Sequence, residues 1–383
     1  MSESLDSGPP PQAPNPPTPT TPLRQRLAEL RGPAAQPHPL DARALAALAA
    51  NPGCKRRALL DGAGVDKTAL ASALGSPAAY GQSQFAFMRG NAFEAKVKAD
   101  GGKELVRLLG LDSPAEVASV RVPDLSAAGP EGRAARTALA LREATATGGW
   151  TLLDHPMLAL EVAGSPAYLE PDVVVVRPDG RWTVVEIKSF PMIDGSADAA
   201  KVGAAARQAA VYVLALERVA ALTGGASVAH TVLLVCPKDF SNLPTASVVD
   251  VRKQLSVTRR QLARLTRIED LAAALPEGAT FDLERPAEEL TAAVESVSAA
   301  YAPECLAACE LAFHCRDRAR ESGAVEALGR AVRGELGGLT TVGAVLAAAR
   351  GGTDHPADDP AVTALRRAAA LRADALKEAA GCR

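Results

Sequence analysis

Apolar and polar residues alternate with helical spacing at both ends of the chain and with strand-like spacing in the middle. Helical spacing begins near Leu23 and returns over residues 41–50. From Trp150 onwards, segments rich in Val and Leu predict β-strands, namely TLLDHPMLALEV, YLEPDVVVV, RWTVVEIKSF and HTVLLVCP. An alanine-rich helix is predicted between the last two, at about residues 197–221, and helical spacing resumes after ASVVDV. We therefore expect an α/β fold in which a central mixed sheet is flanked by helices, with helical additions at both ends.

Composition changes this picture at the N-terminus. Residues 1–22 consist largely of Pro, Ser and Thr and predict a disordered tail. The chain of 383 residues is long enough for one elaborated domain, which we expect over residues 23–320, followed by a helical region over residues 321–383. The formal net charge of −2 gives no overall attraction to nucleic acid, so a DNA-binding surface would have to be a local patch.

The compartment follows from what the sequence lacks. No run of about 18 uncharged apolar residues occurs, and the N-terminus has no basic start followed by an apolar run. We therefore expect a cytoplasmic protein without a membrane partner. In a reducing compartment its six cysteines are not expected to form disulfides, so their spacing matters more than their number.

Charged residues interrupt two of the valine-rich strands: a Pro-Asp pair ending at Asp172, and Glu-Ile-Lys from Glu186 to Lys188. The Arg-Pro-Asp-Gly sequence of residues 177–180 is typical of a tight turn, so the two strands should form a hairpin centred on Asp179. In that register Asp172 faces Glu186, and strand alternation places Lys188 on the same face.

Opposed carboxylates of this kind need a counter-charge. With Cβ atoms about 5 Å apart, Asp172 and Glu186 would repel each other. A divalent cation between them removes the repulsion, and oxygen ligands suit Mg²⁺ or Mn²⁺. Lys188 could then orient or deprotonate water beside a phosphate. The alternative is an exposed sheet edge at which Lys188 simply pairs with one of the acids.

Taken together, these motifs resemble the PD-(D/E)xK nuclease superfamily. Gln208 and Tyr212, spaced i,i+4 on the predicted helix after the Lys188 strand, are similar to the Q-x-x-x-Y signature of its RecB-like branch. The resemblance implies a restriction-endonuclease-like sheet and metal-dependent hydrolysis of DNA, often from single-stranded ends. It assigns metal binding to Asp172, Glu186 and the Ile187 carbonyl, the attacking water to Lys188, and the substrate or the lysine to Gln208 and Tyr212.

Four cysteines extend the resemblance. Cys305, Cys309 and Cys315 lie within eleven residues, whereas Cys54 stands about 250 residues upstream. Four thiolates can hold zinc or a [4Fe–4S] cluster, and the distant fourth cysteine favours the cluster. This spacing resembles the iron–sulfur staple of the AddB nuclease domain and of CRISPR-associated RecB-like exonucleases. By this resemblance, the cluster would clasp the two ends of the nuclease domain.

Two positions depart from the family pattern. The three C-terminal cysteines are spaced C-x3-C-x5-C instead of C-x2-C-x5-C, and one extra residue rotates a ligand on a helix by about 100°. Glu94 stands where the family usually has a histidine. A carboxylate also binds hard cations, so we expect Glu94 either to join the metal site or to be a helix-surface acid near Lys98.

A further candidate is a basic segment. Arg252, Arg260, Arg264 and Arg267 approximate one stripe of a predicted helix and could contact DNA phosphates. A solvated helix face is the alternative explanation.

The sequence thus predicts a Mg²⁺- or Mn²⁺-dependent DNA nuclease with a [4Fe–4S] cluster. The expected partners are DNA and a helicase or other repair or defence proteins, because the sequence carries no nucleotide-binding motif of its own. Two alternatives remain open: an inactive DNA-binding or scaffold protein that keeps the nuclease fold, and a zinc-stapled interaction protein without a nucleic-acid role.

Overall fold

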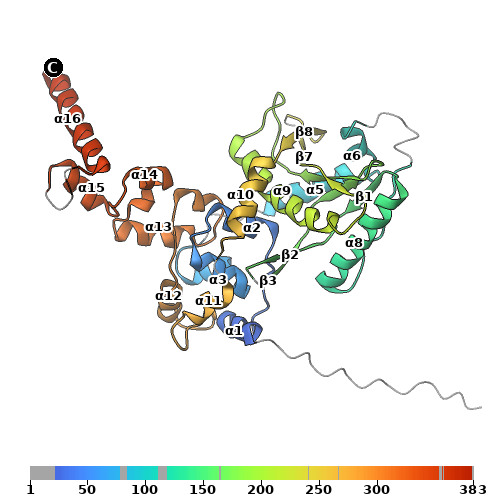
Figure 1. Ribbon diagram of the computed structural model, residues 1–383, viewed down its shortest axis with the longest axis horizontal. Helices are drawn as coiled ribbons and strands as arrows, with labels where there is room; N and C mark the ends of the chain where they lie inside the picture. The colour runs from blue at the N-terminus through green and yellow to red at the C-terminus, as the bar shows by residue number, and fades with distance from the viewer. Residues whose placement is uncertain are drawn as a thin grey trace, which may run out of the picture.

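The computed structural model describes residues 22–77, 84–110, 119–163, 165–239, 241–265, 267–352, 356 and 358–381. The expected N-terminal tail, residues 1–22, lies outside these ranges except for Pro22, which begins helix α1. The described chain has the predicted class, a mixed sheet flanked by helices with further helices at both ends (Figure 1).

A six-stranded sheet lies at the centre, in the order β1-β4-β5-β7-β8, with the short β6 beside one end of β5. Strand β5 pairs antiparallel with β4 and parallel with β7, so it is an interior strand. Strands β2 and β3 form a separate hairpin. The bounds are β1 Thr151–Asp154, β2 Leu158–Val162, β3 Ser165–Leu169, β4 Val173–Val176, β5 Arg181–Ile187, β6 Ser227–Val228, β7 Thr231–Pro237 and β8 Pro244–Asp250.

The hairpin of β4 and β5 has the register that its turn predicts. Val173 faces Val185, and the pairing continues without a bulge to the turn. Asp172, one residue before β4, is therefore opposite Glu186.

Gly180 makes the tight turn possible. Its φ is +77°, a left-handed conformation that glycine adopts without strain. A Cβ atom at this position would also collide with the backbone carbonyl oxygen of Gly225. The turn that sets the register therefore requires glycine for two reasons.

Strands β4 and β5 are buried on both faces, which explains why valine fills these two strands. Val174 and Val184 belong to a core shared with helix α9, Ala199–Ala220. Val173 and Val185 belong to the opposite core, shared with helices α5, Gln84–Lys98, and α6, Lys103–Leu108. Charged residues on these strands consequently point into the protein or lie at the strand ends.

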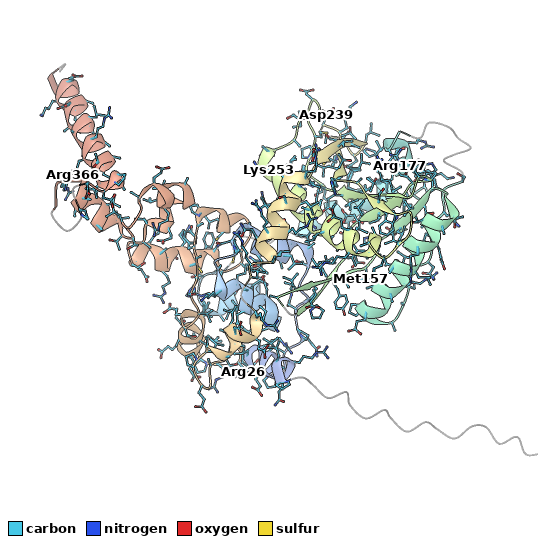
Figure 2. The ribbon with its side chains drawn as sticks, in the orientation of Figure 1. Arg26, Met157, Arg177, Asp239, Lys253 and Arg366 are labelled. Atoms are coloured by element: carbon cyan, nitrogen blue, oxygen red, sulfur yellow. The ribbon has the colours of Figure 1, made fainter. Side chains whose placement is uncertain are left out.

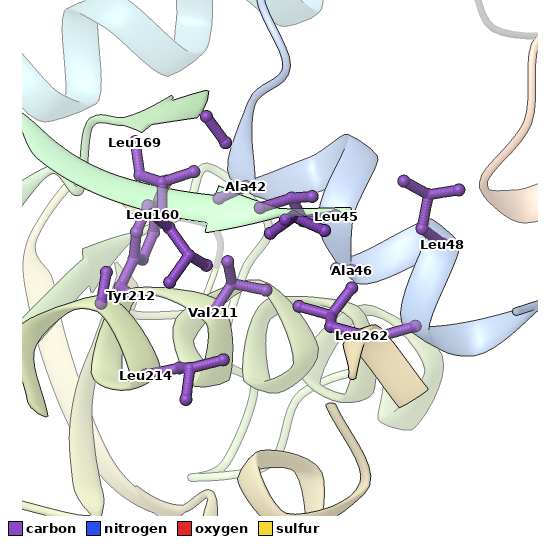
Figure 3. Packing of buried hydrophobic residues seen from close by; sticks show 14 of the residues in the cluster. Ala42, Leu45, Ala46, Leu48, Leu160, Leu169, Val211, Tyr212, Leu214 and Leu262 are labelled. Atoms are coloured by element: carbon purple, nitrogen blue, oxygen red, sulfur yellow. The ribbon is translucent and has the colours of Figure 1, made fainter. Parts of the chain in front are cut away.

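Helix α9 is the alanine-rich helix that the sequence predicts. It packs against α2, Ala42–Ala50, and α10, Arg252–Leu262. In Figure 3, Leu45 of α2, Val211 of α9 and Leu160 of β2 meet in one apolar core. Helix α8, Gly129–Thr147, packs on the β2–β3 hairpin and on β4.

Segments from the two halves of the chain interlock beside the sheet (Figure 1). The N–H of Phe281 donates to the carbonyl of Leu30 at 2.7 Å, and the N–H of Arg56 donates to the carbonyl of Ser298 at 3.0 Å. The helices of this body are α1 Pro22–Arg31, α3 Lys55–Ala63, α4 Lys67–Ala73, α11 Ile268–Ala273, α12 Ala287–Glu295, the 3₁₀ helix η1 Pro303–Ala307 and α13 Ala312–Glu321.

The last helices form an arm with its own small core. Val325, Leu339, Ala348 and Val362 are buried together there. The arm extends away from the sheet, with Arg366 of its last helix far from Arg177 of the β4–β5 turn (Figure 2). No helix in the described ranges is long and apolar enough to cross a bilayer. The arm comprises η2 Val325–Leu328, α14 Arg330–Glu335, α15 Val342–Ala349 and α16 Pro360–Gly381.

Candidate active site and cysteine set

Asp172 lies at the start of β4 and is tied to the neighbouring strand. Its Oδ2 accepts a hydrogen bond of 2.6 Å from the N–H of Ile187. Burial raises the pKa of Asp172, and Lys188 opposes that rise. The predicted juxtaposition of this aspartate with the Glu-Ile-Lys segment is therefore present.

Glu186 is the most buried acid of the site, with 1% of its surface exposed. Its carboxylate faces a small cavity of about 10 Å³ that is otherwise lined by apolar residues, including Ala205 and Ala209 of α9. The Nζ of Lys188 forms an ion pair with Oε1. No described residue, however, donates a well-aligned hydrogen bond to either oxygen. Burial raises the pKa of Glu186 to about 7.

Lys188 follows β5 on the same side as Glu186. Its backbone N–H donates to the carbonyl of Val235 in β7 at 2.9 Å, which fixes the point from which the side chain projects. Burial lowers the pKa of Lys188, but Glu186 and Asp172 more than offset this effect and raise it. The alternative of an exposed sheet edge is wrong about exposure, because β4 and β5 are interior strands and Glu186 is buried. The pairing of Lys188 with one of the acids, which that alternative also expected, is present.

Gln208 and Tyr212 reach the same site from α9. Nε2 of Gln208 donates to Oη of Tyr212 at 3.0 Å, and Tyr212 Oη donates to the carbonyl of Glu170 at 3.1 Å. Burial, reinforced by the nearby Glu186 charge, raises the pKa of Tyr212 well above its ordinary value. The pair thus holds the segment that leads into Asp172, and its direct contact is with protein backbone.

Glu94 lies in the site, but it is engaged by two cationic side chains. Its Oε1 lies 2.6 Å from Nζ of Lys98 and 3.0 Å from Nε2 of His155. Nζ of Lys98 also lies 2.6 Å from Oδ1 of Asp154 and donates to the backbone carbonyl of Asp172 at 3.0 Å. We call Glu94, Lys98, Asp154 and His155 the Lys98 group.

Sequence reasoning missed three members of this group: Lys98 as a site residue, Asp154 and His155. The available signal was weak, since Lys98 is an ordinary i,i+4 partner of Glu94 and His155 merely follows a strand. Their convergence depends on β1 lying beside β4 and on α5 packing against both strands, which no local pattern reveals.

The Lys98 group is strongly coupled electrostatically. Hydrogen bonds to His155 lower the pKa values of Glu94 and Asp154 to about 2, and the same two acids raise the pKa of His155 to about 10. His155 also has a φ of +44°, an uncommon conformation for a residue other than glycine, and such conformations concentrate at functional sites.

Within the described ranges, no three His, Cys, Asp or Glu side chains stand together in an arrangement suited to a metal ion. Asp172 and Glu186 nevertheless fit a hard cation chemically, because Glu186 has buried oxygens that lack aligned donors. No shift of a strand would be needed to bring the two acids to one ion, since they already face each other across the ladder.

The four predicted cysteine ligands lie near one another, although Cys54 comes from the other end of the domain and the described thiols do not form a closed metal-binding group. Electrostatic interactions link the thiol of Cys315 to those of Cys54 and Cys305, and the thiol of Cys309 to that of Cys315. Burial raises the pKa of Cys309 to about 12 and also raises that of Cys315. We call Cys54, Cys305, Cys309 and Cys315 the cysteine set.

Two donors point at the sulfurs of this set. Nδ2 of Asn51 lies 3.5 Å from Sγ of Cys305, and a guanidinium nitrogen of Arg56 lies 3.3 Å from Sγ of Cys315. Arg56 is 7% exposed and also donates to the carbonyl of Val297. A buried cation and an amide would stabilise thiolates, which are the form that binds metals.

The unusual cysteine spacing does not fall within one helix. Cys305 lies in η1, Cys309 lies in the connection after it, and Cys315 lies in α13. The extra residue is therefore accommodated by a 3₁₀ turn and a loop, so the 100° rotation of a continuous helix does not apply.

The prediction that four arginines form a stripe on one helix is wrong. Helix α10 contains Arg252 and Arg260 but ends at Leu262, so Arg264 and Arg267 lie beyond it. The chain must turn there, because the next helix, α11, packs against α3 instead of continuing α10. Arg252 and Arg267 are each paired with a nearby carboxylate, whereas Arg260 and Arg264 are exposed.

We compared the chain with known proteins through family models, curated sequences and solved structures. No family model matches it, and no curated protein or solved structure matches it significantly. The case for a function therefore depends on the residues of the site.

Proposed function

We propose that this chain is a metal-dependent deoxyribonuclease of the RecB-like PD-(D/E)xK type, with a restriction-endonuclease-like sheet. One observation carries the proposal. Asp172 and Glu186 face each other on interior strands beside Lys188, and the oxygens of Glu186 are buried without aligned donors in the described chain. Keeping an anion in such a place costs free energy unless a cation compensates it, and the single ammonium group of Lys188 can compensate only one of the two facing acids.

The residues present fit one divalent cation. Asp172, Glu186 and the carbonyl of Ile187 would supply its oxygen ligands. When bound, Mg²⁺ or Mn²⁺ would polarise the scissile phosphate and lower the pKa of the attacking water. Lys188, held charged by its two acidic neighbours, would orient that water and balance charge that develops on the phosphate.

Gln208 and Tyr212 act as positioning residues in this proposal. Tyr212 holds the carbonyl of Glu170, two residues before Asp172, and Gln208 holds the hydroxyl of Tyr212. Small displacements of a ligand carboxylate have large effects on a reaction that depends on in-line geometry. The pair would therefore maintain the position of Asp172 and have no direct role in the chemistry.

The cysteine set would bind a structural [4Fe–4S] cluster that takes no part as an electron carrier in the hydrolysis. The set joins the segment before α3 to the segment around α13, and Arg56 would balance part of the charge of the thiolates. Following the resemblance, the substrate would be DNA with single-stranded ends. A helicase or another protein of repair or phage defence would supply those ends.

Cleavage assays test this function. End-labelled single- and double-stranded DNA is incubated with the purified protein in Mn²⁺ or in EDTA. We expect cleavage only with Mn²⁺, and a loss of about 10²- to 10³-fold for Lys188→Ala, because a charge-stabilising donor is removed. Lys253→Ala is the matched control, since Lys253 is exposed on α10 and is not one of the residues of the site (Figure 2).

One result of this assay would contradict the proposal. Cleavage that persists at the wild-type rate in Lys188→Ala removes this site from the reaction. Binding of DNA without cleavage by the wild-type protein, under all metal conditions, would instead identify an inactive nuclease fold.

A further inference from the structure

An open groove lies between helix α8 and the β2–β3 hairpin. Its volume is about 330 Å³, and it is lined mostly by apolar side chains. Three of these are the alanines Ala134, Ala135 and Ala138 of α8, whose short side chains leave the groove unfilled. Met157, just before β2, and Tyr168 of β3 form the opposite side. Open apolar surface of this kind commonly marks a docking site.

Tyr168 supplies an aromatic ring that is held in place within this groove. Its hydroxyl donates a hydrogen bond to the carboxylate of Glu131 on α8, so the side chain connects the two sides of the groove. Among the described residues that line the groove, Glu131 alone is charged, and Tyr168 already engages it. The groove therefore favours an uncharged, apolar occupant.

The start of α1 lies near the same ring. The charge of Arg24, two residues after Pro22, acts on the hydroxyl of Tyr168. Such an effect fades beyond about 10 Å, so the point at which residues 1–21 join the described chain is close to the groove. In Figure 1, α1 lies beside the β2–β3 hairpin.

The sequence that precedes α1 suits the groove in chemistry and length. Residues 14–19, PNPPTP, contain four prolines and no charged side chain. Proline favours the polyproline II conformation, which needs no internal hydrogen bonds and binds to apolar grooves with aromatic residues. The part of α8 that lines the groove, residues 131–138, is about 10 Å long. Three or four residues of polyproline II span that length at about 3.1 Å each.

We infer that residues 14–19 bind in this groove as a polyproline II segment, so that the N-terminal tail docks on the side of the molecule formed by α8 and the β2–β3 hairpin. Prolines of the segment pack against Tyr168 and against the alanines of α8. This inference does not depend on the proposed function. Because the segment is tethered to α1, its effective concentration at the groove is in the millimolar range, so weak contacts suffice to keep it bound.

Photo-cross-linking in the full chain tests the docking. Benzoylphenylalanine, a photoreactive amino acid, replaces Thr18 within the segment or, as a control, Ser4 near the start of the tail. After irradiation, mass spectrometry locates the cross-linked peptides. The probe at position 18 should react within its own chain with residues 131–138 or Met157, and the probe at position 4 should not.

Two alanines of α8 provide a matched pair of variants. Ala135→Arg puts a long charged side chain into the groove and should lower the yield of this cross-link roughly tenfold. Ala146→Arg should leave the yield unchanged, because Ala146 is exposed on the same helix but does not line the groove. Replacing Pro16 and Pro17 by glycine should also lower the yield, because glycine is not restricted to the polyproline II conformation.

Hydroxyl-radical footprinting gives a second measurement that needs no probe residue. A docked segment covers the ring of Tyr168. The ring should therefore be labelled several-fold more strongly in the variant with glycine at positions 16 and 17 than in the wild-type protein. Tyr301, which is 8% exposed and does not line the groove, should be labelled equally in both.

Three results would overturn the inference. The first is a cross-link from position 18 that lies outside the groove or persists unchanged in Ala135→Arg. The second is a cross-link that joins two chains, which would assign the groove to a second copy of the protein. The third is equal labelling of Tyr168 with and without the two prolines.

Discussion

Glu186 would link the stability of the fold to the proposed metal binding. Burial raises its pKa to about 7, the Asp172 charge adds to the rise, and the ammonium of Lys188 only partly opposes it. The folded protein therefore binds the Glu186 proton more tightly than the unfolded chain, whose Glu pKa is about 4.3. In the metal-free protein, this residue makes folding progressively less favourable as the pH rises from about 4.3 to about 7, and the cost is constant above that range.

A cation that takes the place of this proton would remove the unfavourable contribution of the buried Glu186 carboxylate to folding. We expect Mn²⁺ to raise the Tm by several degrees at pH 8, since a ligand at 100 times its Kd stabilises a protein by about 2.7 kcal/mol. At pH 5.5 the ion must displace the Glu186 proton, so the Tm shift should be smaller. Differential scanning calorimetry measures both shifts. Glu186→Gln should remove the shift at each pH, and a full shift in that variant would exclude Glu186 as a ligand.

The sequence was informative for some site residues and silent for others. Asp172, Glu186 and Lys188 could be placed together because a local turn sets their register. Gln208 and Tyr212 could be paired because helical spacing is also local. Asp154 and His155 could not be assigned, because their neighbours come from α5 and β4, far away in the chain. Non-local packing, which no periodicity encodes, decides the Lys98 group.

At the scale of elements, the β4–β5 hairpin controls the geometry of the site. The register that opposes Asp172 and Glu186 is fixed by a turn that ends in Gly180, and a slip of one residue would move Glu186 to the other face of the sheet. The sequence predicted this hairpin correctly because its turn residues carry strong conformational preferences. The prediction of one helix carrying all four arginines was wrong, because α10 ends at Leu262 and the chain turns there to pack α11 against α3. Arg264 and Arg267 therefore lie outside the helix.

Gly180→Ala tests the turn. Two effects should destabilise this variant: a φ of +77°, and a collision between the new Cβ and the Gly225 carbonyl. Gly278→Ala is a matched control, because Gly278 has a φ of +76° but no atom lies within 4 Å of the place that a Cβ would occupy. We expect the control to lose about 1 kcal/mol and Gly180→Ala to lose clearly more, as measured by urea denaturation. Equal losses would show that the contact with Gly225 is unimportant.

At the scale of the whole molecule, the cysteine set connects distant parts of the chain. Cys54 precedes α3, and the other three cysteines lie around η1 and α13, so the set spans a loop of about 250 residues. Closing such a loop costs on the order of 5 kcal/mol of chain entropy, and a metal centre can offset that cost. The resemblance to iron–sulfur-stapled nucleases led us to expect these four cysteines near one another, but the polar shell of Asn51 and Arg56 required the structure.

Cys309→Ser tests the staple. Protein purified without oxygen should be brown and absorb near 400 nm, as [4Fe–4S] proteins generally do. We expect Cys309→Ser to lose this absorbance and to unfold at a lower temperature, because one ligand of the clasp is gone. Cys236→Ala is the control, since Cys236 is buried in β7 and lies outside the set. Colourless wild-type protein with stoichiometric zinc would contradict the cluster and indicate a zinc site.

The position of the proposed catalytic ion can be observed directly. Crystals soaked in Mn²⁺ should give one anomalous peak between the carboxylates of Asp172 and Glu186, about 2.1 Å from an oxygen of each. A peak that lies away from both Asp172 and Glu186, or no peak at these two acids under conditions that support DNA cleavage, would contradict the metal site on which the proposed nuclease activity depends.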